Sequence, residues 1–221
     1  SDNIIGGSSP EDRNIISGNG RHGIFITRER GSLGETSGNR IGGNYIGTDA
    51  SGTLALPNGE CGIRLASGTR ETLIGGVLAG QGNVVSGNRE DGIRLSDPGT
   101  TLNVIQGNSI GVNPSGNAAI ANGVAGIRIG AGASANLAGG AESGAGNIIS
   151  GNGRDGVALH GRGTDLNAIR GNFIGLDSSG QDPIPNGARG VDITFGASNN
   201  FVGGSESGQR NAISGNDGEG I

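Results

Sequence analysis

The chain has 221 residues, of which 50 are glycine, only 6 are proline and 2% are aromatic, and its formal net charge is −5. The negative charge argues against nucleic acid or an anionic membrane as a general partner. No apolar run is long enough for a membrane span, and glycine lacks the three-residue period of collagen. With so few aromatic residues, any core must be aliphatic.

Glycine pairs mark a long repeat along the chain. The pairs begin at Gly6, Gly75, Gly139 and Gly203, so their spacings are 69, 64 and 64 residues. A fixed period of this kind predicts a solenoid. We divide the chain into repeat units 2–70, 71–134, 135–198 and a partial unit 199–221, all within one β-solenoid segment, 1–221. The first unit's extra residues lie between 27 and 39 and predict an outward loop.

Each 64-residue unit contains two related coils. An A-type coil has a short run such as 73–76, then a run of the form Asn-x-Ile-Ser-Gly-Asn such as 147–152, then one such as 92–95. A B-type coil begins with 103–113, has a long loop, and ends with 126–129. Both types contain three short runs separated by glycine and asparagine, and no run has the 3.6-residue apolar period of a helix.

Three short strands every 31–33 residues predict an all-β fold, a parallel β-helix of about seven coils. Strands of successive coils would pair at about 4.8 Å, which gives a rod roughly 30–35 Å long. The inward positions should then form three columns of β-branched residues, which suit a pleated surface. The first column is Ile5, Ile41, Ile74, Ile105, Ala138, Ile169 and Val202, and the second is Ile16, Ile46, Val85, Ile110, Ile149, Ile174 and Ile213.

The repeated words Asn-Ile-Ile-Ser-Gly-Asn and Asn-x-Ile-x-Gly-Asn-x-Ile-Gly resemble the parallel β-helix repeats of large bacterial secreted and surface proteins. The resemblance covers nearly the whole chain. It implies a right-handed coil and an extracellular or cell-surface location. Similar repeats occur in adhesins, surface stalks and fibres, and also in polysaccharide lyases, hydrolases and epimerases, so the resemblance is much more specific for fold than for function.

A polar column follows the second strand of each coil. Asp49 and Asp177 each precede a short Ser/Gly turn and could belong to calcium loops, because calcium takes carboxylate and carbonyl oxygens. Asparagine fills the matching positions, however, and both residue types suit a tight corner by bonding nearby N–H groups. We therefore expect no metal site and one structural ladder, made of Asn19, Asp49, Asn88, Asn113, Asn152, Asp177 and Asn216.

The chain carries no recognisable catalytic constellation. Acid–base catalysis needs convergent charged residues, but most carboxylates stand singly in loops, and His22 and His160 lie about two units apart. Cys61 is the only cysteine, so it forms no intrachain disulfide, and no histidine is placed to activate it as a nucleophile. We expect no enzymatic activity and no cofactor.

An arginine column should lie on the outward face of the third strand. The outward residues there are Phe25, Arg64, Arg94, Arg128, Ala158 and Asp192, so three consecutive coils carry arginine. In-register like charges repel by a few tenths of a kcal/mol to ~1 kcal/mol. Arg64, Arg94 and Arg128 could bind an acidic or sulfated polysaccharide, or nearby Glu60, Glu90, Asp91 and Asp97 could neutralise them.

A second outward column is apolar: Ile15, Tyr45, Val84, Ser109, Ile148, Phe173 and Ala212, before the inward residue of strand two. A continuous apolar stripe requires cover. Candidate covers are the B-type loops, with Leu54, Leu56, Ile120 and Ile184, or a neighbouring rod. Neither end carries a capping repeat, so we expect the native chain to continue or to stack end to end.

These observations favour a structural role, as a stiff stalk, fibre or filament module of an extracellular or cell-surface protein, and possible adhesion is part of that hypothesis. The expected partners are other copies or flanking β-helix repeats, packed end to end or laterally. Two alternatives stay open: a glycan-binding module for acidic polysaccharide on the cell surface, and a non-catalytic relative of the polysaccharide lyases and epimerases.

Overall fold

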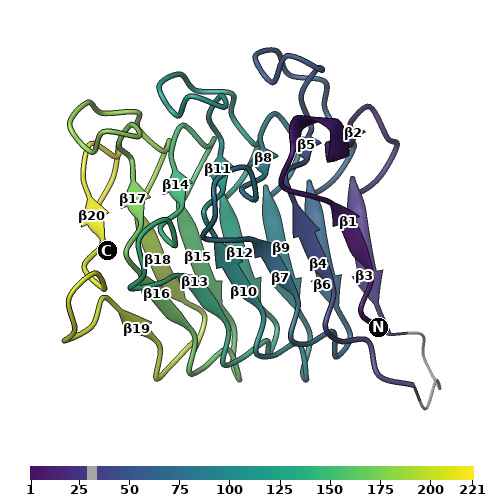
Figure 1. The fold of residues 1–221 in the computed structure, drawn as a ribbon. Coiled ribbons are helices and arrows are strands. Elements are labelled where there is room, and N and C mark those ends of the chain that lie inside the picture. Colours follow the sequence, from purple (N-terminus) through teal and green to yellow (C-terminus); the bar gives the residue numbers. More distant parts are fainter. Residues whose placement is uncertain (29–33) are drawn as a thin grey trace.

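The computed structural model describes residues 1–28 and 34–221, which form a parallel β-helix (Figure 1). Most of the expected loop insertion in the first unit falls on residues 29–33, outside the described residues. Strands of successive coils pair in parallel to make three sheets, so the fold class expected from the repeat is confirmed.

Each sheet takes one strand from each coil, in the order of the sequence. Sheet 1 contains β1 (Ile4–Gly6), β4 (Arg40–Gly42), β7 (Leu73–Gly75), β10 (Val104–Gln106), β13 (Leu137–Gly139), β16 (Ala168–Arg170) and β19 (Phe201–Val202). Sheet 2 contains β2 (Ile15–Ile16), β5 (Tyr45–Ile46), β8 (Val84–Val85), β11 (Ser109–Ile110), β14 (Ile148–Ile149), β17 (Phe173–Ile174) and β20 (Ala212–Ile213). Sheet 3 contains β3 (Ile24–Thr27), β6 (Ile63–Ala66), β9 (Ile93–Ser96), β12 (Ile127–Gly130), β15 (Val157–His160) and β18 (Val191–Thr194).

The strand register reproduces the inward columns. Ile41 pairs with Ile5 on one side and with Ile74 on the other, and Ile110 pairs with Val85 and Ile149. The inward residues from the second to the sixth coil are fully buried in sheets 1 and 2. Because each aliphatic side chain stacks on its copy from the next coil, one continuous core runs the length of the rod.

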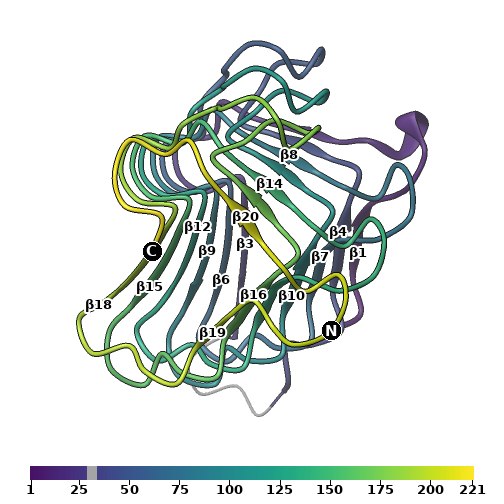
Figure 2. The ribbon, with the colours of Figure 1, turned by 90° about the vertical axis from the view of Figure 1, so that its left-hand side faces the viewer.

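Viewed from the end of the stack, the coils lie one behind another and the longest loops project together on one side (Figure 2). The described residues contain one short 3₁₀ turn, Pro10–Asp12, and no helix long and apolar enough to cross a membrane.

The B-type loops cover part of the apolar stripe on sheet 2. A Cβ added to Gly116 would lie 2.6 Å from Cδ1 of Ile148, and one added to Gly180 would lie 3.0 Å from the ring of Phe173, so the loop backbone rests directly on both side chains. Among the residues expected to provide cover, Ile120 and Ile184 are buried. Leu54 and Leu56 instead face solvent, with 67% and 48% of their surface exposed.

Candidate functional site

Asparagine ladders occupy the corners of every coil. The backbone N–H and the Nδ2 of each ladder asparagine donate to Oδ1 of the asparagine in the next coil, as from Asn83 to Asn108 at 3.0 and 2.9 Å. Nδ2 also donates to a backbone carbonyl of the preceding coil, in this case that of Ile41. The ladder before sheet 2 is Asn14, Asn44, Asn83, Asn108, Asn147, Asn172 and Asn211.

The single Asn/Asp ladder expected from the sequence is divided by the structure into two groups. Asn19, Asn88, Asn152 and Asn216 belong to the ladder between sheets 2 and 3. Their partners in the intervening coils come from the ends of the long B-type loops: Asn58, Asn122 and Asn186. Counting from the inward isoleucine missed these residues because the B-type loop separates them from the strand.

Asp49, Asn113 and Asp177 form the second group, which closes the B-type loops. Each accepts backbone N–H bonds from residues four and five positions later, as Asp177 does from Gln181 at 3.1 Å and Asp182 at 3.2 Å. The hydroxyl of Ser179 donates to Asp177 and lowers the pKa of that carboxyl, as the hydroxyl of Ser51 does for Asp49. These bonds are turn chemistry, and the described residues contain no group of three or more potential metal ligands.

A third ladder precedes sheet 1 and is interrupted once. It comprises Asn3, Asn39, Asn103, Asn136, Asn167 and Asn200, with Thr72 in the third coil. At this position the Nδ2 of Asn39 and the hydroxyl of Thr72 are buried without a hydrogen-bond partner. An unsatisfied buried polar group costs about 1–3 kcal/mol, so the third coil is a weak point in this ladder.

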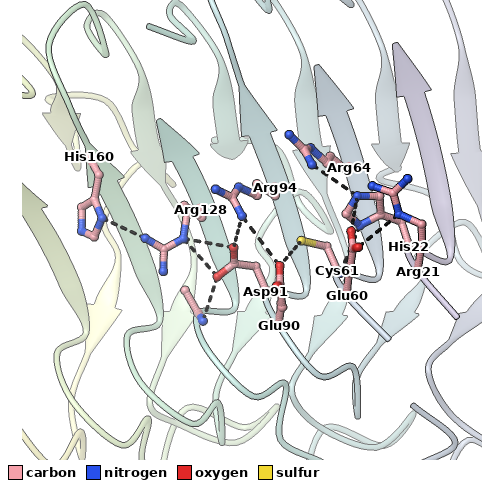
Figure 3. A network of polar contacts seen from close by, with 11 residues as sticks. Arg21, His22, Glu60, Cys61, Arg64, Glu90, Asp91, Arg94, Arg128 and His160 are labelled. Carbon is pink, nitrogen blue, oxygen red and sulfur yellow. Dashed lines mark hydrogen bonds and ion pairs between the residues drawn. The ribbon is translucent and has the colours of Figure 1, made fainter. Parts of the chain in front are cut away.

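The outward face of sheet 3 carries the most concentrated cluster of charged side chains. Arg64, Arg94 and Arg128 stand in register on β6, β9 and β12, with Phe25 before them and Ala158 and Asp192 after them. We call the chain of contacts around these residues the sheet 3 network. Figure 3 shows that carboxylates and histidines lie between the arginines.

His22 anchors the first part of this network. Its side chain is only 4% exposed, its Nδ1 accepts the backbone N–H of Cys61, and its Nε2 lies 2.8 Å from Glu60. A neutral ring that accepts at Nδ1 carries its proton on Nε2, so it donates to Glu60. Burial lowers the pKa of His22, and the hydrogen bond from Arg21 lowers the pKa of Glu60.

Asp91 joins the middle of the network. Its carboxylate is 2% exposed, accepts the backbone N–H of Ala125 at 3.1 Å, and receives Nε of Arg128 at 3.0 and 3.1 Å. Nη1 of Arg94 lies 3.9 Å from Asp91 and 3.7 Å from Glu90. These contacts match the expected neutralisation of the arginine column by Glu90 and Asp91.

The network continues to the sixth coil through His160. Nη1 of Arg128 lies 2.8 Å from Nδ1 of His160, and Nε2 of His160 lies 2.7 Å from Asp192. Because an arginine can only donate, Nδ1 is the acceptor and Nε2–H points to Asp192. As expected, His22 and His160 do not meet, but both bridge arginine and carboxylate side chains, which the sequence argument missed.

Cys61 is fully buried beside this network, with its Sγ 3.6 Å from Glu90. Burial raises the pKa of its thiol to about 12, so the thiol stays protonated near neutral pH. A histidine does approach, but His22 accepts the backbone N–H of Cys61 and makes no hydrogen bond to the thiol. The arrangement does not generate a thiolate nucleophile.

A column of hydrogen-bond acceptors was visible in the sequence and was overlooked. His22, Asp91 and Asp155 each stand three residues after a ladder asparagine and directly before a glycine. Each accepts the backbone N–H of the corresponding residue in the next coil, which is Cys61, Ala125 or Arg189. Asp97 lies outside the network and accepts from the backbone and hydroxyl of Ser67.

Comparison of the chain with protein-family models, with curated proteins and with solved structures gives no match.

Proposed function

We propose that this chain is a structural β-helix repeat region, acting as a stiff stalk, fibre or filament module of an extracellular or cell-surface protein of bacterial type. The observation that carries the proposal is the unbroken stacking of three sheets over one aliphatic core, with asparagine ladders at the corners. A rod whose backbone corners are bonded from coil to coil resists bending, and a spacer needs that property. Flanking repeats or other copies would extend it end to end or laterally.

Stiffness is tested by spin labels on cysteines introduced at Ser8 and Ser205, in a Cys61→Ser background. These loop positions belong to the first and seventh coils. A spacer gives a narrow distance distribution centred near the separation of six coil steps, about 29 Å at 4.8 Å per step. A broad distribution would contradict the proposal.

Location is tested separately, with an antibody against the folded chain on intact cells that produce the native protein. Labelling of intact cells supports a surface role. Labelling that requires permeabilised cells would rule it out.

The alternative in which Arg64, Arg94 and Arg128 bind acidic polysaccharide receives less support. Each of these guanidinium groups already contacts network side chains: Arg94 and Arg128 lie next to Asp91, and Arg64 lies next to His22 and the Phe25 ring. An anionic polymer would have to displace these contacts. Weak retention on heparin resin, unchanged by Arg94→Gln, is the expected result.

A further inference from the structure

An open pocket of about 340 Å³ lies on the loop side of sheet 2, away from the sheet 3 network. Its lining includes Arg13, Tyr45, Leu78, Val84 and Ser109, together with glycine-rich backbone. The volume falls within the roughly 300–1,000 Å³ of small-molecule sites. Neither aspartate nor glutamate lines it.

Arg13 is held in a fixed position in this pocket. Its Nε donates to the carbonyl of Gly43 at 3.2 Å, and its guanidinium carbon lies 4.0 Å from the centroid of the Tyr45 ring. Within the described part of the chain it makes no ion pair with a carboxylate. Arg21, Arg94, Arg128 and Arg189, in contrast, each have an acidic partner.

A fixed, unneutralised guanidinium is well suited to bind an oxyanion. Nε and the stacked ring use one edge and one face of the group, which leaves both terminal nitrogens for a bidentate contact. Because the side chain is already ordered, binding costs little additional conformational entropy.

The rest of the pocket has the mixed character of a sugar site. Val84 and Leu78 offer apolar surface for the C–H face of a ring, and Ser109 offers a hydroxyl. We propose that this pocket binds an anionic sugar residue, with its carboxylate or sulfate on Arg13 and its ring against Val84 and Leu78. This role adds a ligand to the proposed stalk and does not depend on Arg64, Arg94 or Arg128.

The chain contains a natural comparison for this pocket. A second pocket of about 410 Å³ lies 64 residues further along, where Glu142 replaces Leu78 and Phe173 replaces Ser109. No arginine lines it. Gly82, which precedes ladder residue Asn83 as Arg13 precedes Asn14, supplies no side chain. The same backbone frame therefore lacks the cation and gains a carboxylate, and we expect it not to bind the anion.

The test is calorimetric titration of the 221-residue chain with three probes: a uronate tetrasaccharide, a sulfated disaccharide and a neutral tetrasaccharide. Arg13→Gln should weaken binding of the anionic probe at least tenfold, as expected for loss of a charged hydrogen bond. Arg210→Gln is the matched control, because Arg210 is exposed and precedes ladder residue Asn211 in the same way. It should change affinity less than twofold.

Leu78→Glu is the second variant, since it places the carboxylate of the second pocket beside an intact Arg13. Leu78 is 65% exposed, so the change should preserve the fold, and thermal unfolding checks this. Binding should again fall at least tenfold.

Stronger binding of the carboxylate or of the sulfate probe identifies the preferred oxyanion. Failure of both anionic probes to saturate the chain, equal binding of the neutral probe, or equal losses in Arg13→Gln and Arg210→Gln would overturn the proposal. None of these results would affect the structural role.

Discussion

The asparagine ladders and the sheet 3 network are both polar, both run from coil to coil, and are built in opposite ways. The ladders repeat one neutral side chain in one geometry, mostly buried, and nearly every amide is satisfied. The network uses several charged residue types, changes from coil to coil, and is partly open to solvent. The comparison teaches that the coil geometry dictates the corners, whereas the outer face tolerates variation.

The physical reason is the different cost of error in the two regions. A buried amide without its partner loses about 1–3 kcal/mol, and the loss cannot be recovered from water. An exposed ion pair contributes only about 0–1 kcal/mol, because water solvates either partner well. Residue choice is therefore constrained at the corners and relaxed on the outer face.

Removing a ladder amide should have the largest effect. Asn152→Ala removes the acceptor of Asn122 and the donor to Asn186, both inside the rod, and should cost about 2 kcal/mol. Urea unfolding measures the loss. Asn113→Ala, in an exposed loop, is the control and should cost clearly less. Equal losses would contradict the contrast between corner and surface.

The next effect tests the best-buried member of the network. Asp91→Asn removes the charge that faces Nε of Arg128 and should cost about 1–2 kcal/mol. Asp155→Asn is the matched control, because Asp155 accepts the same type of backbone bond but no arginine side chain. If both variants lose the same stability, the ion pair with Arg128 contributes nothing.

A gain is expected where the third ladder is interrupted. Thr72→Asn should supply an Oδ1 to the unsatisfied Nδ2 of Asn39, and it should stabilise the chain by about 1 kcal/mol. Thr72→Val is informative as a partner variant, because it removes the unpaired hydroxyl without completing the ladder. Thr72→Asn should raise the unfolding midpoint more than Thr72→Val does, and the reverse order would show that the break is not an energetic weak point.

A smaller loss is expected in the exposed loops. Asp177→Ala removes the acceptor of two backbone bonds at the surface and should cost about 0.5 kcal/mol. Thermal unfolding with and without EDTA should give the same midpoint for the wild-type chain. A calcium-dependent midpoint that disappears in Asp177→Ala would mean that the loop binds a metal.

The smallest expected effect is a change in pH dependence. Because burial lowers the pKa of His22 below its usual 6.5, its contribution is fully present above pH 6.5 and is lost as the pH falls. The lowered pKa of Glu60 acts in the same direction at lower pH, below about 4.5. Urea unfolding between pH 7 and 5 should show this slope, and His22→Gln should flatten it. An unchanged slope would assign the acid sensitivity to other groups.

The fold was predictable because each coil repeats the same constraint. A β-branched residue at every inward position, such as Ile74 and Ile110, fixed the register of all three sheets. The corner ladder was only partly predictable, because loops of different length place Asn58 and Asn122 in the column to which Asp49 and Asn113 had been assigned.

The outer face was harder to predict, because its contacts join residues from different coils through side chains of different length. The register placed Arg128 correctly. Nothing in the sequence, however, indicated that its guanidinium would lie between Asp91 of one coil and His160 of another. The pocket at Arg13 was likewise invisible, because it is bounded by loops from several coils.

The ladders also give the rod an electrical direction. In every ladder Oδ1 faces the preceding coil and Nδ2 donates to the following one, so the amide dipoles point the same way in all three corners. Aligned peptide dipoles of about 3.5 D add in the same manner along a helix. The stack should therefore present a more negative potential toward its early coils and a more positive one toward its late coils. This axial polarity is independent of the charged residues on its surface.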